Sequence, residues 1–128
     1  MDPAIPQDVA TFIWGAIDRL ETLETLLLLQ ASPAKTWTLE QLMLEMRSSQ
    51  LAAEQTTTVL VSRGLLSLKD GAYCFRPRTP ELEAMAVRLA ACYRERRVSV
   101  IRTIFSRPND AITSFANAFR IKKEGPDG

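Results

Sequence analysis

One β-hairpin in a chain that otherwise has the pattern of helices constrains the fold more than any other feature of the sequence. The stretch SLKDGAYCF at residues 67–75 has Asp70 and Gly71 at its centre. This pair is typical of a type I′ two-residue turn, in which both residues adopt positive φ angles. The turn predicts that residues 66–69 pair with residues 72–75. A hairpin alone is marginally stable in water, so helices must cover one of its faces.

Side chains alternate between the two faces of a strand, which predicts the face that packs. The apolar side chains share one face, which we expect to lie on the helices: Leu66, Leu68, Tyr73 and Phe75. The opposite face carries small or polar side chains: Ser67, Lys69, Ala72 and Cys74, with Cys74 the least polar. The short segment KTW at residues 35–37 is a candidate for one further edge strand.

Apolar spacing predicts helices before and after the hairpin. Residues 9–32 carry apolar side chains four and three positions apart, which is a helical period. This helix ends at Pro33, and a break near residues 18–22 is the alternative to one continuous helix. The remaining helices are expected at residues 39–47, 51–63 and 80–105, with a last amphipathic helix around residues 112–119.

Local signals mark where several of these helices begin and end. Thr38 is a good N-cap, and Gln41 three residues later completes a capping box. Thr79 is the expected N-cap of the long helix, with Pro80 at its first position. Gly64 suits the left-handed position that follows a helix. The sequence therefore predicts a mainly α-helical fold with one small β-hairpin.

The residue types present exclude several common kinds of catalysis and metal binding. The chain has no histidine, so it lacks the usual general base, activator of a nucleophile and zinc ligand. Cys74 and Cys92 do not form a CxxC pair, so we expect two reduced thiols. We therefore expect no enzyme, no cofactor and no metal site. Apolar runs are too short for a membrane span and the N-terminus has no basic region, so a cytoplasmic location is expected.

Charge is unevenly distributed along the chain, although the net charge is only +1. Residues 1–50 are acidic, with a net charge of −4. Residues 88–123 carry nine basic and two acidic side chains, a net charge of +7. A basic C-terminal third indicates either an anionic partner or an acidic face of the same protein.

The order helix, helix, turn, helix, Gly and hairpin occurs over residues 22–77, with the motifs TLEQLMLEMRSSQLAAEQTTTVLVSRGLL and SLKDGAYCF. This order resembles the winged helix-turn-helix superfamily, as used by small bacterial MarR-like transcription regulators. The resemblance implies a winged helix-turn-helix domain at residues 22–79. A helical arm would precede it at residues 1–21, added helices for dimerisation or packing would follow at residues 80–123, and residues 124–128 would be a disordered tail.

The resemblance implies a DNA-binding transcription regulator, with helix 51–63 in the major groove of double-stranded DNA and the hairpin at residues 65–76 as the wing. Residues of the helix–turn–helix and of the wing would then contact DNA: Arg47, Ser49, Gln50, Gln55, Thr58, Ser62, Arg63, Lys69, Arg76 and Arg78. This set has few basic residues for phosphate contacts. A protein-interaction module or adaptor that does not bind DNA is therefore the alternative.

The wide apolar arc of the first helix and the length of helix 80–105 predict a homodimer. The expected interface residues are apolar side chains of the terminal helices: Phe12, Ile13, Ile17, Leu89, Tyr93, Ile101, Ile104, Phe105, Phe115 and Phe119. Four arginines cluster within this region: Arg94, Arg96, Arg97 and Arg102. We expect them to pair with carboxylates, with Glu21, Glu24, Glu40 and Glu45 as candidates, and direct DNA contact is the alternative.

Overall fold

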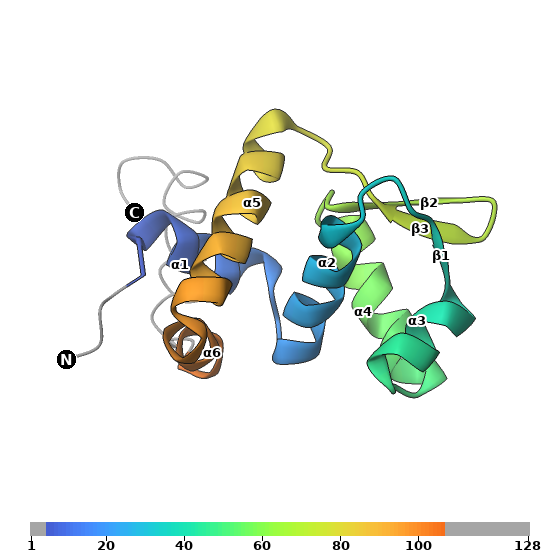
Figure 1. Ribbon diagram of the computed structural model, residues 1–128, viewed down its shortest axis with the longest axis horizontal. Helices are drawn as coiled ribbons and strands as arrows, with labels where there is room; N and C mark the ends of the chain where they lie inside the picture. The colour runs from blue at the N-terminus through green and yellow to red at the C-terminus, as the bar shows by residue number, and fades with distance from the viewer. Residues whose placement is uncertain (1–4, 107–128) are drawn as a thin grey trace, which may run out of the picture.

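The computed structural model describes residues 5–106, which form six helices and three short strands (Figure 1). The elements follow in the order α1 (Gln7–Ala16), α2 (Leu20–Ala31), β1 (Trp37–Thr38), α3 (Leu39–Met46), α4 (Gln50–Ser62), β2 (Leu66–Lys69), β3 (Ala72–Phe75), α5 (Pro80–Glu95) and α6 (Arg97–Phe105). The expected helix around residues 112–119 and the expected tail at 124–128 lie outside the described residues. A mainly helical chain with a small antiparallel sheet is confirmed.

The sheet has the strand order β1-β3-β2 and is antiparallel throughout. The hairpin register is the predicted one, with Leu66 opposite Phe75 and Lys69 opposite Ala72. Asp70 and Gly71 have φ angles of 53° and 77°, as a type I′ turn requires. The short strand β1 pairs with β3 at this edge of the sheet, and of the expected residues 35–37 it includes only Trp37.

One side chain departs from the predicted apolar face of the hairpin. Leu66 and Phe75, at the end near α4, are buried in the core. Leu68, next to the turn, is 52% exposed. Figure 1 shows the reason, because the hairpin tip extends to the right beyond the helices. Strand alternation predicted which face Leu68 lies on, but no helix reaches far enough to cover it.

The helix boundaries follow the predicted capping residues. The Thr38 hydroxyl accepts a hydrogen bond from the backbone N–H of Gln41, and the Gln41 side chain accepts one from the N–H of Thr38. Thr79 caps α5, which has Pro80 at its first position. Gly64 follows α4 with a φ angle of 80°. These capping predictions are confirmed.

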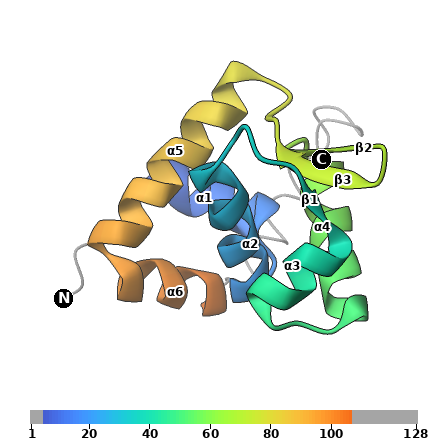
Figure 2. The same ribbon diagram turned by 45° about the vertical axis from the view of Figure 1, so that its right-hand side comes forward.

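Two expected long helices are each divided in the structure. Residues 9–32 form α1 and α2, so the break near residues 18–22 is the correct alternative. The single helix expected at 80–105 is wrong, because α5 ends at Glu95 and α6 begins at Arg97 (Figure 2). Arg96 between them has φ −138° and ψ 55°, outside the helical region. The elbow turns α6 towards α1, where the Trp14 indole N–H donates to the Thr103 carbonyl at 3.0 Å.

The buried side chains of all the helices belong to one continuous core. Ile13 of α1, Leu29 of α2, Leu60 of α4 and Leu89 of α5 are each fully buried within it. The hairpin joins the same core through Leu66 and Phe75, described above. The N-terminal helix therefore packs into the body of the molecule.

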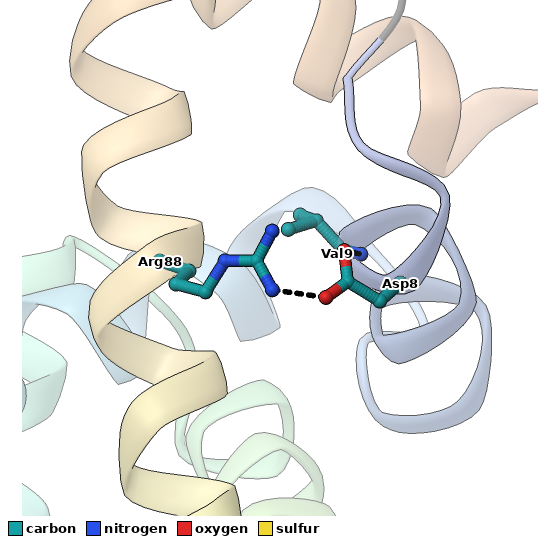
Figure 3. Close-up of polar contacts among 3 residues, drawn as sticks. All are labelled: Asp8, Val9 and Arg88. Carbon is teal, nitrogen blue, oxygen red and sulfur yellow. Dashed lines mark hydrogen bonds and ion pairs between the residues drawn. The ribbon is translucent and has the colours of Figure 1, made fainter.

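An ion pair on the surface links α1 with α5. Arg88 Nη1 donates to Asp8 Oδ2 (Figure 3). Asp8 also accepts a hydrogen bond from the backbone N–H of Val9 at 2.9 Å. The hydrogen bond from Arg88 is the main cause that lowers the pKa of Asp8 below its usual value. Both side chains are about half exposed, so this contact orients the two helices more than it stabilises them.

Candidate functional site

Helix α4 is packed on one side and uncovered on the other. Ala53, Thr56, Thr57 and Leu60 are buried and point towards the rest of the protein. Thr57, a polar residue in this buried set, donates its hydroxyl hydrogen to the Ala53 carbonyl at 2.9 Å, so its burial leaves no unpaired donor. The remaining side of α4 is in contact with solvent and is mostly polar, with Leu51 as its exposed large apolar side chain.

All ten residues expected to contact DNA are exposed: Arg47, Ser49, Gln50, Gln55, Thr58, Ser62, Arg63, Lys69, Arg76 and Arg78. They come from the α3–α4 turn, the uncovered side of α4, and the hairpin with the segment that follows it. Arg47 ends α3 with a φ angle of 54°. The sequence therefore predicted correctly that these side chains lie at the surface.

Several polar side chains of α4 are already engaged within the chain. Ser49 caps the helix by accepting from the N–H of Ala52 at 3.1 Å. Gln50 donates to the Glu54 carboxylate at 2.9 Å. Ser62 donates to the Val59 carbonyl at 2.8 Å. The side chain of Thr58 makes no hydrogen bond within residues 5–106. Its hydroxyl is therefore not engaged by this part of the chain.

Arg78 has a structural role that the sequence does not reveal. Its guanidinium lies over Gly64, so that a Cβ added there would be 3.3 Å from Arg78 Cζ. Its Nη2 atom is 3.5 Å from the Val61 carbonyl in the last turn of α4. The backbone N–H of Arg78 also donates to the Gly64 carbonyl at 2.7 Å. Arg78 therefore closes the C-terminal end of α4, where a cation is favourable.

The hairpin has a shallow hollow on its polar face. This hollow has a volume of about 650 Å³ and is lined by Lys69, Asp70, Cys74 and Arg76, among others. Two basic side chains and one carboxylate thus share the solvent-exposed face of the sheet. The hairpin contributes modest positive charge near α4.

Arg19 is a basic residue beside α4 that sequence reasoning missed. It lies between α1 and α2, and its Nη2 atom donates to Gln55 Oε1 at 3.4 Å and to Thr56 Oγ1 at 3.3 Å. No sequence signal links residues 36 positions apart in different helices. The contact arises because α2 packs along α4, which brings the start of α2 to the middle of α4.

The expected dimer interface is corrected in four positions. Ile13, Ile17, Leu89 and Ile104 are at most 4% exposed, so they belong to the chain's own core. The wide apolar arc of residues 9–32 is used inside one molecule, since α1 packs against α5 and α6. Phe12, Tyr93 and Ile101 are half-buried, and Phe105 is 71% exposed. Phe115 and Phe119 lie outside the described residues.

Two arginines of the cluster, Arg94 and Arg97, do not form the expected ion pairs within residues 5–106. Neither Arg94 nor Arg97 pairs with Glu21, Glu24, Glu40 or Glu45, and the ion pair within residues 5–106 joins Arg88 to Asp8. Arg97 instead lies with its guanidinium carbon 5.2 Å from the centre of the Tyr93 ring. For Arg97, this cation–π contact stands in place of the predicted carboxylate.

A groove lined by apolar side chains lies where α2, α3 and α5 meet. It has two adjoining parts of about 310 and 440 Å³, which share Leu27 and Tyr93. Glu24 and Glu45 lie at the α3 end, and Arg94 lies at the α5 end. Burial raises the pKa of Tyr93 above its usual value. The groove is separate from the uncovered side of α4.

The part of the chain that the structure describes holds no group of three or more His, Cys, Asp or Glu side chains able to bind a metal ion. Within residues 5–106, no helix is both long enough and apolar enough to cross a membrane. No protein-family model matches the chain, and neither the curated proteins nor the solved structures include a match. Function is therefore inferred from the residues and their arrangement.

Proposed function

We propose that this protein is a DNA-binding transcription regulator of the winged helix-turn-helix class. In this proposal α3 and α4 form the helix–turn–helix, α4 lies in the major groove, and β2 and β3 form the wing. The observation that carries the proposal is the uncovered polar side of α4, next to a hairpin whose Lys69 and Arg76 are exposed. A helix with one packed face and one polar face can enter a groove without unfolding the core.

The side chains on α4 suit contacts with base edges. Thr58 has an uncommitted hydroxyl, and Gln55 retains its amide N–H₂ group as a donor. Both types can bond to bases in the major groove. Ser49 and Gln50 stand at the start of the helix, the end that first approaches the bases in this mode.

Phosphate binding would fall to the basic residues around α4. These are Arg47, Arg63, Lys69 and Arg76, all exposed, together with Arg19. Glu54 and Asp70 oppose the same phosphates, so the net positive charge is small. Modest affinity that falls steeply with salt is the expected behaviour.

Fluorescence anisotropy with labelled duplex DNA of random sequence tests the proposal at low salt. We expect binding at about micromolar protein, weakened by salt. Lys69→Ala should weaken binding to every sequence, while Arg88→Ala, which removes a charge of α5 that pairs with Asp8, should not. Absence of binding, or binding that does not respond to salt, would contradict the proposal.

The second candidate is a protein-interaction module built on the same helices. The observation that favours it is exposed apolar surface, with Leu44 of α3 80% exposed and Leu51 of α4 64% exposed. The wild-type protein should then capture a partner protein at a fixed stoichiometry. Leu44→Asp and Leu51→Asp should abolish that capture. Under this candidate, Gln55→Ala and Lys69→Ala leave that capture unchanged.

We propose that the regulator is a homodimer and that α6 contributes to the interface. Val98 and Phe105 are 64% and 71% exposed, and with the half-buried Ile101 they form one apolar stripe on α6. Light scattering should give twice the chain mass of 14.3 kDa, and Phe105→Asp should lower it to one chain. A wild-type protein of one chain mass at micromolar concentration would refute the dimer.

A further inference from the structure

The guanidinium of Arg19 has only neutral partners in the part of the chain that the structure describes. Its Nη2 atom donates to the Gln55 amide oxygen and to the Thr56 hydroxyl. The neighbouring carboxylate of Asp18 accepts a hydrogen bond from the Thr22 hydroxyl instead. No carboxylate within residues 5–106 forms an ion pair with Arg19. A positive charge is thus held against α4 without a compensating negative charge.

Burial makes this arrangement costly for the free protein. The residue is half-buried, and its Nε atom is inaccessible to solvent and without a hydrogen-bond partner. Burying a cation without an anionic partner costs free energy, which a bound anion would recover. The two N–H groups of Nη1 also donate to no described residue, so they are the donors open to a ligand.

The position of Arg19 indicates which anion this is. Its partner Gln55 is on the uncovered side of α4, so the guanidinium lies at the edge of that side. Lys69 lies on the hairpin and Arg76 directly after it, whereas Arg19 lies at the start of α2. A helix in the major groove has a sugar–phosphate strand along each of its two sides. A basic residue at the edge of the uncovered side of α4 is placed to meet one of these strands.

We infer that Arg19 is a phosphate-binding residue that contacts the DNA backbone on the α2 side of α4. The inference rests on the proposed DNA-binding function and adds to it a contact that local sequence does not indicate. The DNA phosphate supplies the negative charge that the Arg19 guanidinium lacks in the free protein. The bond from Nη2 to Gln55 holds the side chain against α4 while Nη1 faces the phosphate.

The experiment measures how DNA affinity varies with salt, because each phosphate contact adds about 0.9 to the slope of log affinity against log salt. Labelled random duplex DNA is titrated with the full chain and with three variants. Arg19→Met should lower the slope by about 0.9 per protomer and weaken binding several-fold. Arg19→Lys, which keeps the charge, should retain the slope. Arg88→Met, which removes an arginine of α5 that pairs with Asp8, should leave it unchanged.

Each outcome bears on the inference. A folded Arg19→Met protein with the wild-type slope overturns it and leaves the proposed function standing. Wild-type protein that does not bind DNA overturns both. An equal loss of slope in Arg88→Met also overturns it, because net charge would then be the cause. If Arg19→Met does not give the wild-type circular dichroism spectrum, Arg19→Gln, which is neutral but keeps a donor for α4, takes its place.

Discussion

Gly64 and Gly71 have positive φ angles of 80° and 77°, but their surroundings differ. A Cβ at Gly64 would be 3.2 Å from Arg78 Cβ, while nothing lies within 4 Å of a Cβ at Gly71. Gly71→Ala should therefore cost the backbone strain alone, about 1 kcal/mol of unfolding free energy, and Gly64→Ala about 2 kcal/mol. Gly15→Ala, in helix α1 with open space around it, is the control and should be neutral or stabilising. Urea denaturation measures all three, and equal losses at Gly64 and Gly71 would contradict the role of Arg78.

Asp8 gives a residue-level prediction for pH. Its pKa is lowered in the folded protein, chiefly by the hydrogen bond from Arg88, so the unfolded chain binds the proton more readily. The small stability gain is complete above the unfolded pKa and is lost as pH falls through the lower folded pKa. Asp8→Asn should flatten the pH dependence of the denaturation midpoint between about pH 2 and about pH 6. A variant with the wild-type pH profile would show that this ion pair contributes nothing in solution.

At the level of elements, Thr38 links the sheet to helix α3. It ends β1, pairs opposite Ala72 and caps α3 with its hydroxyl. Thr38→Ala should lower the unfolding free energy by about 1 kcal/mol, since the backbone N–H of Gln41 loses its acceptor. Thr58→Ala, on the exposed side of α4 with no side-chain hydrogen bond, should be neutral or slightly stabilising. Thermal melting compares the two, and equal effects would mean that the cap is not formed.

The elements also show where sequence patterns stop being informative. Capping residues and the Asp70-Gly71 turn predicted helix starts and the hairpin register correctly, because these signals act between residues close together in the chain. The elbow at Arg96 was not predicted, since the apolar spacing of α5 and α6 fits one long helix equally well. Packing of Val100 and Ile104 on the core decides where that helix ends.

At the scale of the whole molecule, the continuous core predicts a single cooperative unfolding transition. Leu89 is fully buried in α5, so Leu89→Ala should lower the unfolding free energy by about 2–5 kcal/mol. Val87 on the same helix is 53% exposed, and Val87→Ala should cost far less. Circular dichroism and tryptophan fluorescence, which reports Trp14 and Trp37, should give coincident urea transitions. Separate transitions would mean that the N-terminal helix and the sheet unfold independently.

The sequence alone determined the predicted helix caps, the hairpin register and the residues of α4 that stay exposed. Helical periodicity specifies which side of a helix is apolar, and in α4 Ala53, Thr57 and Leu60 are buried while Gln55 and Thr58 are exposed. Only the tertiary structure decided what each apolar side packs against, so it assigned Ile13 and Leu89 to the core and not to a partner. It alone brought Arg19 to Gln55. The physical reason is that periodicity reports the solvation of one helix, whereas contacts between distant helices depend on how several such faces are buried together.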